Sequence, residues 1–133
     1  MSKGENKIEK ILKENNINYQ KEFSFPGLVG YKNVPLRYDF VIFDFFGKVR
    51  YIIEYDGEGH FNKIDYFTKS KKEFNHRLEM DRRKNKYALV NNIPLVRIPY
   101  WDLEKITFET IFNNINYRVK SIYHNDIINP NKR

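Results

Sequence analysis

The chain has 133 residues, 41% of them hydrophobic, which is enough for one folded domain and excludes a disordered tail. A formal net charge of +7 favours a polyanionic partner, nucleic acid before an anionic membrane surface, although a basic surface that binds nothing would carry the same charge. The absence of cysteine excludes disulfides, a thiol nucleophile and cysteine-bound zinc. With no signal peptide and no apolar run of about 20 residues, we expect a cytoplasmic protein without a membrane partner.

The chain opens with a predicted amphipathic helix over residues 2–15. Ser2 and Glu5 have the spacing of a capping box, in which each side chain bonds the backbone N–H of the other residue. The apolar stripe of this helix consists of Ile8, Ile11 and Leu12. The capping box accounts for Glu5 without any further role.

Three strands are expected next, over 19–25, 36–43 and 50–56. A two-residue turn at Phe46-Gly47 would join the second and third strands into a hairpin. In that register Asp39 lies directly opposite Glu54, with the two Cβ atoms about 5 Å apart.

The second half of the chain predicts a long helix over 69–91, a short strand over 94–98 and a final helix over 107–123. One face of the long helix carries Phe74, Leu78, Asp81, Asn85 and Ala88. The order α-β-β-β-α-β-α predicts an α/β fold with a three-layer mixed sheet. We expect a single domain over 1–133, with a core of about 2–101.

Asp39 and Glu54 stand out because each is an acid embedded in an apolar strand, where an unpaired carboxylate is costly. Strand alternation puts Asp56 on the same face as Glu54. Carboxylates so placed are candidate ligands for Mg²⁺, with Mn²⁺ as the alternative ion. The competing explanation is structural: each acid pairs with a nearby base such as Arg37 or Arg50.

Two further groups could act in the chemistry of this centre. His60 follows a Gly-x-Gly bend after Glu54 and could transfer a proton, although a lone histidine is usually structural. Asp81 points the same way as the core residues of its helix, and Lys84 one turn later could reach the same centre. An ordinary surface pair of Asp81 with Lys84 explains them equally well.

Basic residues cluster around the long helix and are candidates for binding phosphates. They are Lys63, Lys69, Lys71, Lys72, Arg77, Arg82, Arg83 and Lys86. A solvated helical face remains the alternative for any one of them.

Several segments together resemble a branch of the PD-(D/E)XK nuclease superfamily that includes very-short-patch-repair-like and EDxHD phage homing endonucleases. They are Gly4-Glu5, Tyr38-Asp39-Phe40, Ile53 to Gly57 with His60, Asp81 to Asn85, and Ile93 to Ile98. The resemblance covers roughly residues 4–101. It implies a restriction-endonuclease-like sheet and a metal-dependent DNA endonuclease, from a phage or mobile element, acting in a bacterial or phage-infected cell.

The resemblance assigns Glu5 as the first acid, Asp39 as the metal-bridging aspartate, His60 as the histidine and Asp81 as the final aspartate. Glu54 falls at the variable position. The chain departs from the superfamily pattern by carrying Asp56 where a lysine is expected, so His60 or Lys84 would have to substitute. It also has no cysteines for the zinc site of the mismatch-repair relatives, and T·G mismatch repair is therefore not expected.

We therefore expect an enzyme that binds DNA, as a monomer or homodimer, and hydrolyses phosphodiester bonds with Mg²⁺. Two alternatives remain: a structure-specific nuclease such as a junction resolvase, and a non-catalytic basic module that binds nucleic acid. Embedded acids at Asp39 and Glu54 argue against the non-catalytic module, because binding phosphates needs no carboxylates.

Overall fold

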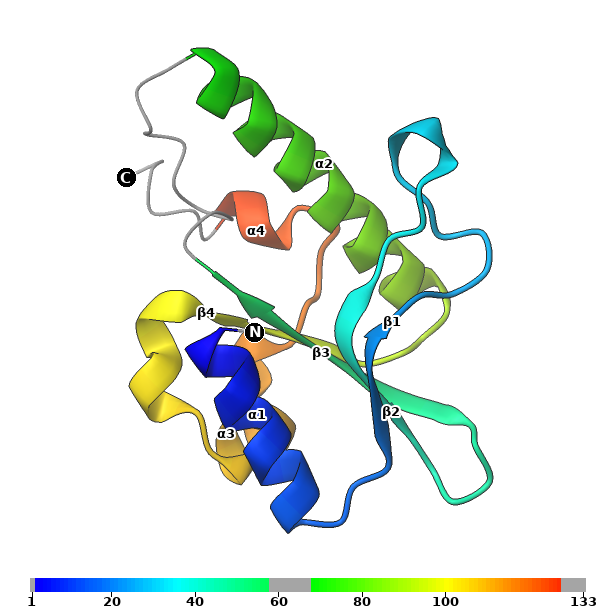
Figure 1. The fold of residues 1–133 in the computed structure, drawn as a ribbon, viewed down its shortest axis with the longest axis vertical. Coiled ribbons are helices and arrows are strands. Elements are labelled where there is room, and N and C mark those ends of the chain that lie inside the picture. The colour runs from blue at the N-terminus through cyan, green and yellow to red at the C-terminus, as the bar shows by residue number, and fades with distance from the viewer. Residues whose placement is uncertain (1, 58–67, 128–133) are drawn as a thin grey trace.

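A computed structural model describes residues 2–57 and 68–127 of the chain. The chain forms a four-stranded mixed sheet in the order β1-β2-β3-β4, with helices on both faces (Figure 1). β1 (Tyr19–Phe23), β2 (Tyr38–Phe43) and β3 (Val49–Asp56) are antiparallel, and β4 (Leu95–Pro99) runs parallel to β3. The expected mixed α/β class is confirmed.

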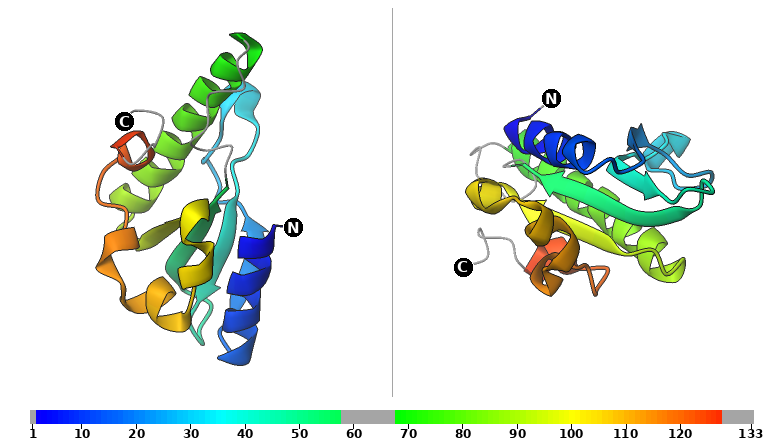
Figure 2. Two further views of the ribbon diagram at one scale, coloured as in Figure 1. Left: turned by 90° about the vertical axis from the view of Figure 1, so that its left-hand side faces the viewer. Right: turned by 90° about the horizontal axis from the view of Figure 1, so that it is seen from below.

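Two apolar clusters hold the layers together. Ile8 and Leu12 of α1 (Lys3–Glu14) pack with Phe40 and Ile53 on one face of the sheet. On the other face, Ala88 of α2 (Thr68–Val90) packs in a second cluster. The left view of Figure 2 shows the strands between α1 and the C-terminal half of α2. The two long helices therefore enclose the sheet from opposite sides.

The local predictions for α1 and α2 hold. The capping box of Ser2 and Glu5 is present, and Asn15 caps the C-terminal end of α1. All five residues of the predicted inner face of α2 are buried: Phe74, Leu78, Asp81, Asn85 and Ala88. Phe74, Leu78 and Ala88 are the apolar part of this face, and its polar members Asp81 and Asn85 contact the buried Arg97 of β4, so α2 docks on the sheet through both kinds of contact.

The hairpin between β2 and β3 differs from the predicted two-residue turn. Its loop has three residues, because the Asp44 N–H donates to the Lys48 carbonyl at 2.8 Å and Gly47 takes the left-handed conformation with φ 83°. A register shift beside Ile42 leaves Arg50 as an extra residue in β3. The extra residue in the loop and the extra residue in β3 offset each other. From Ile42 back toward the start of β2, the pairing with β3 is therefore the predicted one.

The final predicted helix, 107–123, is wrong. The structure has instead α3 (Phe108–Asn113), a 3₁₀ turn η4 (Ile115–Tyr117) and α4 (His124–Ile127). The Asn114 side chain accepts a hydrogen bond from the Asn116 N–H at 2.9 Å, which competes with helix continuation. Beyond it, the Val119 N–H donates to the Leu95 carbonyl at 2.8 Å, so the chain follows the free edge of β4.

The remaining elements are two 3₁₀ turns, η1 (Tyr31–Asn33) before β2 and η3 (Tyr100–Lys105) after β4. The loop before η1 starts at Pro26, where Gly27 has a positive φ of 84°. No helix in residues 2–57 and 68–127 is long and apolar enough to cross a membrane.

Candidate metal centre

Carboxylates from three adjacent strands lie side by side at one place in the sheet. The β1–β2 register pairs Lys21 with Phe40 and Phe23 with Tyr38, so Glu22 lies opposite Asp39. The β2–β3 register continues from the pair Phe40 and Ile53 to Asp39 and Glu54. Glu22, Asp39 and Glu54 therefore form one row across the sheet.

The regular backbone hydrogen bonding between the strands is interrupted at this row. The Asp39 N–H donates to Glu54 Oε2 at 3.0 Å, and the Tyr55 N–H donates to Asp39 Oδ2 at 2.7 Å. Carboxylates thus accept N–H groups that the partner strand's carbonyls would accept in a regular ladder. On β1, Glu22 has a φ of 52°, an unusual conformation for a non-glycine residue. Such local departures from regular backbone gather at functional sites.

The first helix brings a fourth carboxylate to the row. Gly4 packs against the Tyr55 ring so closely that a Cβ on Gly4 would lie 2.3 Å from a ring carbon. This close approach carries Glu5 to the sheet, where one oxygen each from Glu5, Glu22 and Asp39 lie within 4.8 Å of one another. The three acids line a pocket of about 340 Å³ together with Lys21 and Phe40. Glu5 therefore both caps α1 and faces the acidic pocket.

The charges at the row are strongly coupled. Burial, and next the negative charge of Glu54, raise the pKa of Asp39 to about 10. Burial also opposes ionisation of Glu54, but the charges of Lys84 and Arg97 outweigh it and hold the pKa of Glu54 below its ordinary value. Without a cation, the Asp39 carboxyl thus holds a proton at neutral pH, while Glu54 is ionised.

Lys84 supplies the counter-charge of Glu54. Its ammonium reaches from α2 and forms an ion pair with Glu54 Oε1, with both side chains largely shielded from water. The lysine backbone is held in turn, because the Tyr38 hydroxyl donates to the Lys84 carbonyl at 2.7 Å. The predicted approach of Lys84 to this centre is confirmed. In the described part of the chain, neither Arg37 nor Arg50 forms an ion pair with Glu54 or Asp39.

Asp56 has the predicted orientation but a different environment. It lies on the α2 side of the sheet, as Glu54 does, and is buried with an ion pair of 2.7 Å to Arg97 Nη1. Arg97 is fully buried, faces Glu54 across the parallel β3–β4 register and also approaches Asp81 at 3.5 Å. A carboxylate committed to a buried guanidinium is a poor ligand for a second cation, so we leave Asp56 out of the candidate metal shell.

Asp81 belongs to the same buried cluster. It is 2% exposed, which rules out the surface pair considered for it and agrees with its predicted inward orientation. Asn125 of α4 donates to both Asp81 and Asp56, at 3.0 Å and 3.1 Å. Asn125 was not predicted as a site residue, because it belongs to α4, a short helix that the sequence pattern did not predict.

The predicted DNA-binding residues divide into two groups. Lys71, Lys72, Arg77 and Lys86 are exposed on α2, which suits contact with phosphates. Arg82 is instead paired with Asp126 and Glu79, and Arg83 with Glu79, so both are already partly neutralised. Lys63 and His60 lie outside the described residues, and so does the side chain of Lys69.

Comparison of the chain with models of known protein families, with curated proteins and with solved structures finds no match. The function must therefore be argued from the centre itself.

Proposed function

We propose that the protein is a metal-dependent nuclease that hydrolyses phosphodiester bonds in DNA. The observation that carries the proposal is the convergence of Glu5, Glu22 and Asp39, in a row with Glu54, at a break in the sheet ladder. Burial and, after it, repulsion by the Glu54 carboxylate raise the pKa of Asp39. A divalent cation would relieve that repulsion.

The donor set fits a hard cation. Asp39 and Glu5 are the acids that we assign to Mg²⁺, with Glu22 as the third member of their group; Mn²⁺ would accept the same oxygens. When bound, the ion would polarise a phosphate oxygen and acidify a water molecule. Lys84 holds the Glu54 carboxylate in place and keeps it ionised, so that it can accept a proton or orient water. The superfamily pattern has a lysine at the position of Asp56, and we assign the role of that lysine to Lys84.

The fold supports the same proposal. An antiparallel β1–β2–β3 meander followed by α2 and a parallel β4 is compatible with a restriction-endonuclease-like sheet. The exposed Lys71, Lys72, Arg77 and Lys86 on α2 would draw the DNA backbone toward an acidic centre that would otherwise repel it. We infer a phage or mobile-element endonuclease as the biological setting.

A plasmid assay tests the proposal. The purified chain is incubated with supercoiled plasmid in Mg²⁺, in Mn²⁺ and in EDTA, beside Asp39→Asn and the control Glu14→Gln, which removes an exposed acid from the end of the same α1 helix. We expect nicked or linear plasmid with the parent and with Glu14→Gln, and none with EDTA or Asp39→Asn. Cleavage by Asp39→Asn at the parental rate would overturn the assignment.

A four-way junction in parallel separates a resolvase from a duplex endonuclease, since both would use the same carboxylates. Cleavage of the junction alone would move the substrate class to branched DNA. DNA binding without cleavage of either substrate, in both metals, would leave the non-catalytic module as the function.

A further inference from the structure

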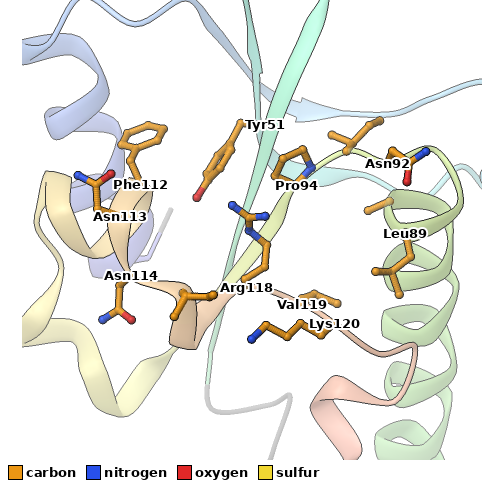
Figure 3. Close-up of a pocket in the computed structure, with 13 residues that line it drawn as sticks. Tyr51, Leu89, Asn92, Pro94, Phe112, Asn113, Asn114, Arg118, Val119 and Lys120 are labelled. Carbon is orange, nitrogen blue, oxygen red and sulfur yellow. The ribbon is translucent and has the colours of Figure 1, made fainter.

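A second cavity lies at the other end of β3 from the carboxylate row. It measures about 640 Å³ and is bounded by Tyr51 of β3, the C-terminal end of α2, and the segment that follows α3 (Figure 3). Tyr51 and Glu54 are three residues apart, or roughly 10 Å along a strand. None of the residues that line the cavity is an Asp or Glu.

Arg118 projects into this cavity from a fixed backbone. Its main chain is bridged to Val96 of β4, and the next residue, Val119, donates to Leu95 at 2.8 Å. Its guanidinium carbon lies 5.9 Å from the centre of the Tyr51 ring. Figure 3 shows the guanidinium between Tyr51 and Pro94, with Lys120 on the same wall. Two cations therefore face one cavity.

The Arg118 side chain has no counter-ion in the described part of the chain. Its Nε is buried and has no hydrogen-bond acceptor in that part of the chain, which is unfavourable for a polar group. Other partly or fully buried arginines are neutralised: Arg82 by Asp126, Arg83 by Glu79 and Arg97 by Asp56. Arg118 thus departs from the pattern that this protein follows elsewhere.

Nearby backbone carbonyls do not satisfy the guanidinium either. α2 and α3 both end at the cavity, and helix C-termini offer free carbonyls. Yet within residues 2–57 and 68–127 no hydrogen bond joins the Arg118 side chain to a carbonyl. The wall also carries the carboxamides of Asn92 and Asn114, whose NH₂ groups can donate. Within the described residues, the Arg118 guanidinium therefore meets the neutral Tyr51 hydroxyl and neutral carboxamides in this cavity, but no carboxylate.

We propose that this cavity binds a phosphate group, through the Arg118 guanidinium and the Lys120 ammonium. The guanidinium offers two parallel N–H donors that match two phosphate oxygens, and Lys120 adds a second positive charge. The phosphate can come from a nucleic-acid backbone or from a free phosphate ester. The site needs neither the metal nor the carboxylate row, so it stands independently of the proposed nuclease activity.

The test is an NMR titration of the ¹⁵N-labelled full chain in EDTA, in which no metal-dependent cleavage can occur. The arginine Nε–H signals are followed during addition of sodium phosphate, and separately of a short DNA duplex, with sodium chloride matched for ionic strength. Arg118→Lys assigns the signal. Lys120→Gln tests the second cation, and because Lys120 is exposed this variant should fold even if changes at Arg118 do not. Arg50→Gln, an exposed arginine beside Tyr51, is the control.

We expect a saturable shift of the Arg118 Nε–H signal, an affinity about fivefold weaker in Lys120→Gln, and parental affinity in Arg50→Gln and in Asp39→Asn. That fivefold loss corresponds to about 1 kcal/mol, the usual scale of one partly exposed charge contact. Saturation by phosphate supports the site with a free ester as a source, and a shift with DNA alone supports it with the backbone as the source. No shift with either, or equal affinity in Lys120→Gln, overturns it.

Discussion

Asp39→Asn should stabilise the metal-free protein at neutral pH, even though it removes the central residue of the proposed site. The asparagine keeps an oxygen for the Tyr55 N–H and places an NH₂ group where the protonated acid would face Glu54. It therefore imitates the protonated form of Asp39 without the cost of holding a proton. The Tyr55 and Glu54 contacts are preserved, and only the charge changes.

The size follows from proton linkage. The folded protein raises the pKa of Asp39 from an ordinary 3.8 to about 10, so at pH 7 the carboxyl binds a proton that the unfolded chain has released. Stability is thus lost as pH rises above about 4, at about 1.4 kcal/mol per unit, which gives a ceiling of about 4 kcal/mol at pH 7. Because Asp39 is only half-buried, solvent screening should reduce the gain in Asp39→Asn to about 1–3 kcal/mol.

Urea unfolding of the parent, Asp39→Asn and Glu14→Gln in EDTA at pH 4 and pH 7 measures this directly. The advantage of Asp39→Asn should be near zero at pH 4 and present at pH 7. Adding Mg²⁺ should stabilise the parent and Glu14→Gln but not Asp39→Asn, because a ligand that binds only the folded state raises its stability. An advantage that is absent at both pH values, or equal at both, would refute the coupling of Asp39 to its acidic neighbours.

Three further substitutions probe the rest of the centre. Lys84→Met should cost about 3–5 kcal/mol in urea unfolding by leaving Glu54 buried without its counter-charge, and Glu54→Gln in the same chain should recover most of it. Gly4→Ala should cost about 1–3 kcal/mol, because its Cβ would overlap the Tyr55 ring, and should weaken Mg²⁺ binding in calorimetry as α1 shifts. Asp56→Asn should destabilise by about 3 kcal/mol while the folded protein keeps parental Mg²⁺ affinity; a lost affinity would return Asp56 to the metal shell.

Asp39 and Glu54 were identified from the sequence for a sound physical reason, but their pairing was predicted correctly only because two local differences cancelled. An acid embedded in an apolar strand is costly wherever the strand lies, so Asp39 and Glu54 stood out without a structure. Their pairing, by contrast, depended on a hairpin register. The predicted two-residue turn was one residue short, and the extra Arg50 in β3 restored the register by the same amount. Turn type and strand irregularity are tertiary outcomes that a pattern of alternating residues does not encode.

Glu22 was missed because it looks like an ordinary exposed acid on an edge strand. Only the β1–β2 register, which depends on the loop after Phe23, places it opposite Asp39. The spacing that places Glu54 and Asp56 on one face was read correctly, but spacing cannot say that one acid meets a lysine and the other a buried arginine. That division is made by α2 and β4, which are distant in sequence.

The two buried ion pairs explain why this centre can be acidic and still fold. Glu54 and Asp56 lie on the α2 side of the sheet, and each is matched there by one cation, Lys84 or Arg97. On the α1 side, Glu5 and Glu22 lie near Asp39, and no ion pair joins these three to a lysine or arginine in the described part of the chain. The uncompensated charge is thus confined to the side with the pocket, where a cation from solution can enter. Folding stability and metal affinity are therefore assigned to opposite sides of one sheet, which is why substitutions at Asp56 and Asp39 should separate them.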